Sequence, residues 1–306
     1  MKYLVTGGAG FIGSECVRQL MVDDNNKVYV VDKLTYAADL KRLPLTNSNL
    51  EIIELDIINF KNLTSLVQEI DVVLHFAAET HVDNSITNGY PFVKTNIEGS
   101  YEILETCRAS NSRLIMVSTD EVYGPFNTGE AHENDNLKPS SVYSASKAGA
   151  DLLSLANIKT HNQNLVITRC CNNYGPNQNP EKFLPTVIES IRQNKKIPLY
   201  GDGKNIREWI HVKDHVRAIL KLIQHWTPGE IFNIGTKDRF TNIEIVRKIL
   251  SICERTEDLI DFVPDRKGHD LRYALNSEKI KNHISWIPEI SIEDGLRELL
   301  EASIVV

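Results

Sequence analysis

A glycine-rich turn near the start of the chain constrains the fold more than any other feature. Gly7-Gly8-Ala9-Gly10-Phe11-Ile12-Gly13 follows an apolar run, Lys2–Thr6, that predicts a strand, and it opens a helical pattern over Phe11–Val22. Glycines make the turn tight and let the backbone approach a pyrophosphate, while the helix N-terminus offers free N–H groups. This order of elements predicts dinucleotide binding by Gly7, Gly10, Phe11, Ile12 and Gly13. A glycine turn without a ligand fits the fingerprint poorly.

An acidic residue stands where such a fold places the adenosine ribose. Asp32 ends a second apolar run, Lys27–Asp32, and lies 19 residues beyond Gly13. A carboxylate there can bind both ribose hydroxyls and repels a 2′-phosphate, which favours NAD over NADP. The adjacent Lys33 has the opposite charge and leaves NADP as the alternative.

The first half of the chain alternates strand and helix patterns. Its strands are continuously apolar rather than alternating, which is typical of a parallel sheet covered on both faces. Further strands are expected at Leu50–Leu55, Asp71–Phe76, Arg113–Ser118 and Leu165–Arg169, and helices between them at Pro91–Ser110 and Ala145–Ala156. The pattern predicts an α/β fold with a Rossmann-type, doubly wound parallel sheet over residues 1–175.

After residue 175 the pattern of the sequence changes, because the expected helices and strands are shorter and Pro and Gly residues interrupt them. We expect residues 176–306 to form a smaller α/β C-terminal substrate domain, with some chain crossing back to the first. Its expected helices are Phe183–Gln193, Val212–His225, Thr241–Glu254 and Ile292–Glu301, and its expected strands are Ile197–Tyr200 and Glu230–Ile234.

Composition excludes several classes of protein. The 306 residues carry a net charge of -7, which argues against nucleic acid as a partner. No apolar run approaches the roughly 18 residues of a membrane span. The cysteine count is five, with no C-x-x-C motif and no export signal, so we expect reduced thiols in a cytoplasmic protein.

A tyrosine and a lysine four residues apart suggest the chemistry. Tyr143 and Lys147 form a Y-x-x-x-K motif, and residues four apart share a helix face. A phenol with a pKa near 10 is a poor base at neutral pH, but a neighbouring ammonium and the nicotinamide charge lower that pKa. Ser118 and Thr119, at the end of the fifth strand, are placed to hydrogen-bond the same hydroxyl.

Together these motifs resemble a known family. The chain resembles the extended short-chain dehydrogenases/reductases, and within them most closely the dTDP-glucose 4,6-dehydratases, over nearly its whole length. Besides the glycine turn and the Tyr143–Lys147 pair, the resemblance is carried by Val31–Ala37, Ala77–Asp83, Ser118–Gly124, Asn172–Pro176, Pro180–Lys182 and Arg266–Tyr273.

The most specific part of the resemblance is Thr119-Asp120-Glu121. Related 4-epimerases and decarboxylases share the glycine turn and the Tyr/Lys pair but are not expected to carry this tandem of carboxyls. Adjacent like charges cannot ionise equally easily, which suits one acid and one base. A solvated acidic loop is the alternative for Asp120 and Glu121.

The resemblance implies a reaction in three steps. Tyr143 takes the proton of the sugar 4-hydroxyl while hydride passes to NAD, with Thr119 polarising the 4-oxygen and Lys147 beneath the tyrosine. Glu121 then removes the 5-hydrogen while protonated Asp120 donates to the departing 6-hydroxyl. Hydride then returns to carbon 6 and a proton returns to carbon 5, giving dTDP-4-keto-6-deoxyglucose.

The resemblance also implies two sets of binding residues. Those expected at the cofactor, besides the glycine turn, are Asp32, Lys33, Leu34, Thr35, Asp56, Ile57, Ala77, Ala78, Thr95, Ser118, Tyr143, Lys147 and Asn173. Those expected at the nucleotide-sugar substrate are Thr80, Thr119, Asp120, Glu121, Asn172, Glu181, Lys182, Pro198, Tyr200, Arg207, Asn242, Arg272 and Tyr273. A homodimer through the helices Pro91–Ser110 and Ala145–Ala156 is expected; their apolar faces serve equally well as internal core.

Several alternatives stay open at this stage. The segment between Gly124 and Tyr143 is short, Val142 replaces a usual proline, and Asn84 replaces an expected arginine, so a UDP-sugar 4,6-dehydratase or a 4-epimerase is a second reading. A non-catalytic NAD-binding regulator is a third, but it would be expected to lose Tyr143 or Lys147.

Two histidines have the spacing of a metal-ligand pair but are expected to be structural. His211 and His215 lie four apart on an expected helix, and neither a catalytic carboxylate nor a third ligand accompanies them. No metal is therefore expected.

Overall fold

Seven strands form one parallel sheet in the order β10-β6-β5-β4-β1-β2-β3. They appear in a computed structural model that describes residues 1–266 and 268–304. The strands are β1 Lys2–Thr6, β2 Lys27–Asp32, β3 Leu50–Glu54, β4 Val72–His75, β5 Arg113–Thr119, β6 Leu165–Cys170 and β10 Ile231–Ile234. Most of their side chains are buried, as the continuously apolar runs indicate.

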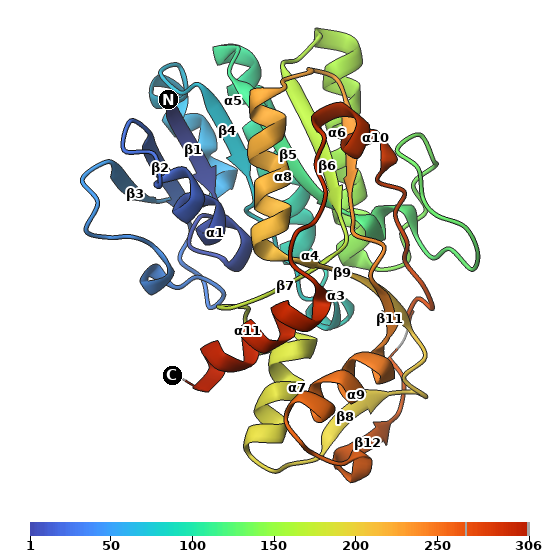
Figure 1. Cartoon of the computed structure of the whole chain (residues 1–306). Helices are drawn as coiled ribbons and strands as arrows, with labels where there is room; N and C mark the ends of the chain where they lie inside the picture. Colours follow the sequence, from blue (N-terminus) through green and yellow to red (C-terminus); the bar gives the residue numbers. More distant parts are fainter. Residues whose placement is uncertain (267, 305–306) are drawn as a thin grey trace.

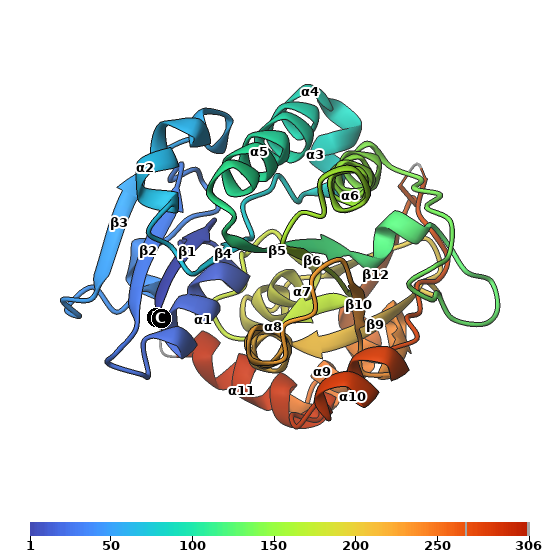
Figure 2. The same ribbon diagram turned by 90° about the horizontal axis from the view of Figure 1, so that it is seen from above.

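Helices cover both faces of this sheet (Figure 2). One face carries α2 Thr64–Val67, α3 Val82–Thr87, α4 Tyr90–Phe92, α5 Ser100–Ser110 and α6 Val142–His161. The other carries α1 Phe11–Leu20 and α8 Val212–Gln224. The chain reverses its direction of winding between β1 and β4, the place where doubly wound sheets bind ligands. The predicted Rossmann-type fold is confirmed.

Two of the expected helices differ most from their expected bounds. The expected helix Pro91–Ser110 consists of α4, a π-helical stretch Val93–Gly99, and α5. Helix α6 begins three residues before the expected Ala145 because Ser141 caps it: the Ser141 hydroxyl accepts from the Ser144 N–H at 3.0 Å, and the Ser144 hydroxyl accepts from the Ser141 N–H at 3.0 Å. This capping box brings Tyr143 into the first helical turn.

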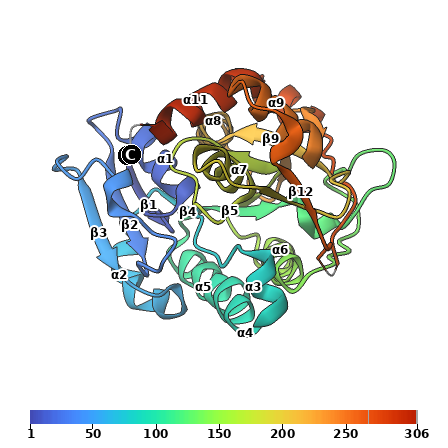
Figure 3. The ribbon, with the colours of Figure 1, turned by 90° about the horizontal axis from the view of Figure 1, so that it is seen from below.

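The second half builds a smaller α/β layer below the carboxyl edge of the main sheet (Figures 1 and 3). Its strands are β7 Asn172–Tyr174, β8 Ile197–Tyr200, β9 Ile206–His211, β11 Arg239–Thr241 and β12 Ile260–Val263. Its helices are α7 Phe183–Arg192, α9 Asn242–Ile252 and α11 Ile292–Ile304. Helix α10 Glu278–Ile284 instead packs against β10 at the main sheet (Figure 1). A separate apolar core joins α7, β8, α9 and α11 through side chains such as Leu184, Leu199, Ile249 and Leu296.

One strand of the second half crosses back to the main sheet. The predicted run Glu230–Ile234 forms β10, which pairs in parallel with β6 and so extends the main sheet. Phe232 and Ile234 are buried against the main core, and this burial selects β6 as the partner. Helix α8 returns with it and packs beside α1.

Among the described residues, no helix combines the length and apolar character that a membrane crossing requires.

Candidate active site

A large pocket runs along the carboxyl ends of β1, β2, β4, β5 and β6. Every residue expected at the cofactor lines it except Leu34, including Thr35, Ile57, Ala78 and Thr95. Of the residues expected at the substrate, Thr80, Thr119, Asp120, Glu121, Asn172 and Lys182 line it as well. The pocket therefore brings the proposed redox site and the proposed acid–base site into one space.

The glycine turn leaves no room for side chains. Gly7 has a left-handed φ of 67°, and a Cβ on it would lie 2.7 Å from the Ala77 nitrogen after β4. A Cβ on Gly13 would collide with the Gly7 carbonyl oxygen. The first turn of α1 therefore sits directly against the end of β1, with its free N–H groups at the pocket, a cradle that fits a dinucleotide pyrophosphate.

The ribose position is also preorganised. Asp32 accepts the Ala9 N–H on one carboxylate oxygen at 3.0 Å and the Leu34 N–H on the other at 2.9 Å. Each oxygen keeps a lone pair for a ribose hydroxyl. The Lys33 ammonium pairs with the Asp56 carboxylate at 2.6 Å. Its charge is therefore matched within the protein, which favours NAD over NADP.

Helix α6 presents Tyr143 and Lys147 to the pocket from one face. Both side chains are buried, and the Lys147 ammonium donates to the Val117 carbonyl oxygen at 2.8 Å. Phe92 packs edge-on against the Tyr143 ring. The tyrosine thus stands at the end of β5, beside Thr119.

The protein groups around Tyr143 do not lower its pKa as the sequence argument expected. Burial raises the pKa of Tyr143 well above 10, and the nearby Glu121 carboxylate adds to this, while a hydrogen bond with Thr119 acts in the opposite direction. Lys147 stabilises the phenolate little because its ammonium is directed at Val117, and burial lowers the pKa of Lys147 itself.

The two adjacent carboxyls occupy different surroundings. Asp120 is buried, and burial and then Glu121 raise its pKa well above the ordinary value. One Asp120 oxygen contacts the Thr119 hydroxyl at 3.2 Å, and the other has no hydrogen-bond partner among the described residues. Glu121 is half-buried; burial raises its pKa less, because Arg207, Arg266 and Lys182 oppose the shift. The arrangement can hold Asp120 protonated while Glu121 is ionised.

Three cations converge beside Glu121. Arg207, on β9, is buried and donates to the Asp270 carbonyl oxygen at 3.0 Å while its guanidinium stacks on the Tyr273 ring at 4.6 Å. The Arg266 Nε is buried without a hydrogen-bond partner among the described residues. Lys182 donates to the Thr80 carbonyl oxygen at 3.0 Å. Such a cluster is chemically suited to a diphosphate.

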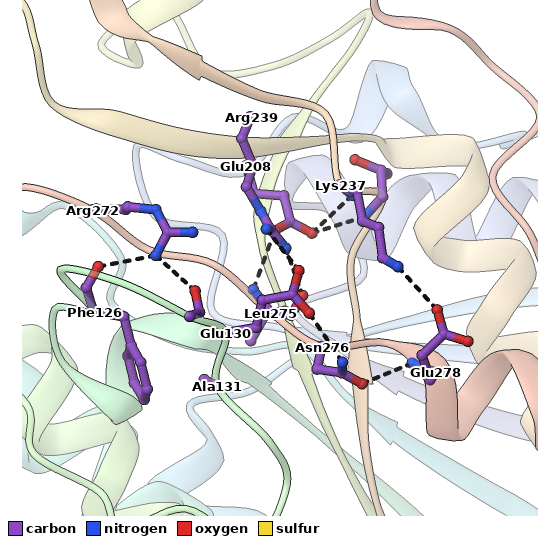
Figure 4. A network of polar contacts seen from close by, with 12 residues as sticks. Phe126, Glu130, Ala131, Glu208, Lys237, Arg239, Arg272, Leu275, Asn276 and Glu278 are labelled. Atoms are coloured by element: carbon purple, nitrogen blue, oxygen red, sulfur yellow. Dashed lines mark hydrogen bonds and ion pairs between the residues drawn. The ribbon is translucent and has the colours of Figure 1, made fainter.

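The remaining residues expected at the substrate lie outside the pocket lining. Pro198 and Tyr200 are exposed on β8, Glu181 is exposed in the loop before α7, and Asn242 begins α9. Arg272 directs its guanidinium to the carbonyl oxygens of Phe126 at 3.1 Å and Gly129 at 2.8 Å (Figure 4). Its charge thus holds the loop that precedes α6. The roles assigned to these residues stay predictions.

Asn173 and the paired histidines also take structural positions. The Asn173 amide donates to the Cys171 carbonyl oxygen at 3.1 Å and accepts from His215 Nδ1 at 2.8 Å. His211 ends β9 instead of lying on a helix with His215, so the expectation that both share a helix is wrong. The described residues contain no group of three or more potential ligands arranged to hold a metal ion.

Comparison with known proteins shows to which family this chain belongs. A model of the family described as GDP-mannose 4,6 dehydratase matches residues 4–299. The chain belongs to this family. The match begins within β1 and ends within α11, so the glycine turn, the carboxyl pair and the cation cluster all lie inside it.

Individual relatives of the family match the chain over nearly its whole length. The low-salt glycan biosynthesis protein Agl12 of Haloferax volcanii is 44% identical over 304 residues, which cover 98% of each chain. The dTDP-glucose 4,6-dehydratase of an Actinoplanes species is 42% identical over 307 residues, covering 97% of this chain and 96% of that one. The resemblance to the dTDP-glucose 4,6-dehydratases is confirmed.

A solved structure within the family shares the fold closely. DesIV, the dTDP-glucose 4,6-dehydratase of Streptomyces venezuelae crystallised with NAD and TYD bound, has a TM-score of 0.96 and 40% identity, covering 100% of this chain and 97% of that one.

Some residues that line the pocket were not predicted from the sequence. Gln178 and Asn179 line the pocket although only a Pro/Gly-rich loop was expected there. Arg266 lies in a stretch singled out by the sequence, but Arg272 was preferred within it. Nothing in the local pattern separates these two arginines, because the direction of each guanidinium depends on contacts with distant segments.

Proposed function

We propose that this protein is a dTDP-glucose 4,6-dehydratase, a lyase that converts dTDP-glucose to dTDP-4-keto-6-deoxyglucose and water with NAD as a bound cofactor. The observation that carries the proposal is the Asp120–Glu121 turn at the end of β5. It faces Tyr143 across a pocket whose other end is a dinucleotide cradle. An oxidation site and an elimination site in one pocket are what this reaction requires.

The first step falls to residues around Tyr143. Tyr143 in its phenolate form would take the proton from the sugar 4-hydroxyl, and Thr119 is placed to polarise the same oxygen. Lys147, one helical turn away, donates to the Val117 carbonyl oxygen and so anchors this face of α6 to the end of β5. NAD supplies the hydride acceptor at carbon 4 and the hydride donor at carbon 6.

The elimination falls to the carboxyl pair. A 4-keto group acidifies the 5-hydrogen, which the ionised Glu121 removes. The C6–O6 bond breaks as protonated Asp120 gives its proton to the oxygen, which leaves as water. A proton returns to carbon 5 when hydride returns to carbon 6. The raised pKa of Asp120 favours its protonated form, and Arg207, Arg266 and Lys182 favour the ionised form of Glu121.

The same three cations would bind the negatively charged diphosphate of the nucleotide sugar. We assign the nucleotide to the region between residues 176 and 306, with Arg207 stacked on Tyr273 as a diphosphate contact. Thymine is the favoured base of the nucleotide, because relatives of this chain are dTDP-glucose 4,6-dehydratases. A 4-epimerase needs no acid for a departing hydroxyl, so the buried Asp120 argues against it.

The oligomeric state and the cellular location are part of the same proposal. We infer a homodimer because exposed apolar side chains gather on neighbouring helices of one face, with Tyr101 on α5 and Val142 and Leu152 on α6. The cysteines are free thiols, which fits the cytoplasm.

Mass spectrometry of the purified protein incubated with dTDP-glucose, with UDP-glucose in parallel, tests the proposal. Loss of one water from the dTDP sugar alone is expected. Water loss only from the UDP sugar would keep the mechanism and overturn the base. No water loss from either sugar would contradict the dehydratase.

The separate roles of the two carboxyls can be tested by isotope exchange. Glu121→Gln should still oxidise carbon 4 but should neither exchange the 5-hydrogen with deuterium from solvent nor release water, with turnover lowered by about 10²–10⁴-fold. Asp120→Asn serves as the matched variant: it should exchange the 5-hydrogen yet release water slowly. Equal exchange in both variants would show that the roles are misassigned.

A further inference from the structure

Three segments that line the pocket meet at one arginine. Arg42 lies after β2, and its Nη1 donates to the Ala37 carbonyl oxygen at 3.0 Å and to the Ala9 carbonyl oxygen at 3.4 Å. Its Nη2 donates to the Asn179 side-chain oxygen at 3.2 Å. The Asn179 amide donates in turn to the Ala37 carbonyl at 3.2 Å. One guanidinium therefore joins the glycine turn, the loop after β2, and the loop after β7.

The loop after β7, residues 175–182, is held on both sides of the pocket; we term it the strap. At its start the Gln178 amide donates to the Asn173 carbonyl oxygen at 2.9 Å. At its end the Lys182 ammonium donates to the Thr80 carbonyl oxygen at 3.0 Å. Between these points lies the Arg42–Asn179 contact. Gln178, Asn179 and Lys182 all line the pocket, so the strap forms one of its walls.

The partners of Arg42 are unusual for an arginine near the surface. Its described hydrogen bonds go to neutral carbonyl and amide oxygens, and it forms no described ion pair within 4.0 Å. Arg192, by contrast, is exposed on α7 and pairs with Glu189 one turn away. Asn179 is only 7% exposed although it lies in a loop. Hydrogen bonds from a charged donor to buried acceptors are the stronger kind, so this contact resists opening.

We propose that Arg42 and Asn179 are positioning residues that clasp the strap over the pocket and retain the dinucleotide between turnovers. The inference rests on the proposed function, because a cofactor that is oxidised and reduced within one turnover has no need to leave. Neither residue touches the reacting atoms. They act by holding Ala37, the glycine turn and the strap in one closed arrangement around the cofactor.

The clasp is tested by the rate at which bound NAD leaves. Arg42→Met keeps the apolar stem and removes the donors, and Asn179→Ala removes the other half of the contact. Each is loaded with NAD, and exchange against excess isotopically labelled NAD is followed. About tenfold faster release of NAD is expected in each single variant. Because the two residues contact each other, the double variant should release NAD less than about a hundredfold faster, the increase that two independent effects would give. Arg192→Met is the matched control and should release NAD at the wild-type rate.

The outcomes separate the clasp from a general loss of stability and from the proposed reaction. Faster release with an unchanged midpoint of urea unfolding for the NAD-free protein supports the clasp. Wild-type release rates in both variants would overturn it, as would a wild-type protein that holds no NAD. If Arg42→Met does not fold, Asn179→Ala decides, because it leaves the arginine bonds to Ala37 and Ala9 in place. The release of NAD is measured without substrate. A protein that fails to dehydrate dTDP-glucose would therefore contradict the proposed function but not the clasp.

Discussion

The two neighbouring carboxyls show how far the surroundings of single residues can separate chemically identical groups. Asp120 is buried next to Glu121 and has one oxygen without a described partner, so its pKa rises strongly. Glu121 faces Arg207, which is the largest influence opposing the rise of its pKa. Activity should therefore fall at low pH as Glu121 is protonated, and at high pH as Asp120 loses its proton.

Substitution of Arg207 should shift the pH dependence of activity. Arg207→Gln removes the cation that most favours ionised Glu121, so the pKa of Glu121 should rise further. The acidic limb of the kcat/KM profile should then move to higher pH, while KM rises because a diphosphate contact is lost. The measurement is kcat/KM from acid to neutral pH, with Arg192→Gln as an exposed control. An unmoved limb, or one shifted to lower pH, would contradict the proximity argument.

Among the elements, α6 is the one that places the proposed catalytic pair, and a buried ion pair fixes it to the sheet. Asp151 on α6 meets Arg169 on β6 at 2.7 Å, with both side chains almost fully buried. Arg169 also donates to the Tyr123 hydroxyl at 2.7 Å, next to the turn that carries Asp120. Helix, strand and catalytic turn are therefore held by one guanidinium.

Breaking this pair should be costly, because it leaves a buried charge without its counter-charge. Asp151→Asn is expected to lower the free energy of unfolding by about 3–5 kcal/mol, measured by urea denaturation. Glu189→Gln, which breaks the exposed pair on α7, should leave the midpoint almost unchanged. If both substitutions lowered the free energy of unfolding by the same amount, the buried pair would contribute no more to stability than the exposed one.

Across the whole molecule, the two halves of the chain are joined by a polar network as well as by their apolar cores. Glu208, fully buried on β9, accepts from Arg239 at 2.6 Å and from the Leu275 N–H at 3.1 Å. Arg239 also pairs with Glu130 at 2.8 Å, in the loop between the catalytic turn and α6 (Figure 4). The network therefore links the segment around Arg207 to the loop that leads into Tyr143.

The proposed homodimer predicts a change in mass on substitution of one exposed apolar residue. Leu152 on α6 is 57% exposed, and burial of this face against a second copy would remove it from water. Leu152→Glu should convert the dimer to a monomer in sedimentation velocity. Ile287→Glu, at an equally exposed site outside that face, should leave the dimer intact. A monomeric wild type, or a dimeric Leu152→Glu variant, would refute the interface.

Features that depend on neighbours along the chain can be predicted from the residues alone. A strand, a glycine turn and a helix in immediate succession determine the dinucleotide cradle, since turn geometry and helix capping act over a few residues. Apolar runs without alternation determine a sheet buried on both faces. The four-residue spacing of Tyr143 and Lys147 determines that they share a face once α6 forms.

Which distant segments meet depends on how the whole chain packs. β10 joins β6 because its buried face completes the main core, which its own pattern does not reveal. Arg207 and Arg266 both approach Glu121, whereas Arg272 is directed to the loop before α6. The reason is physical: a side chain's partner across long sequence separations follows from packing of the whole molecule, and no local preference encodes it.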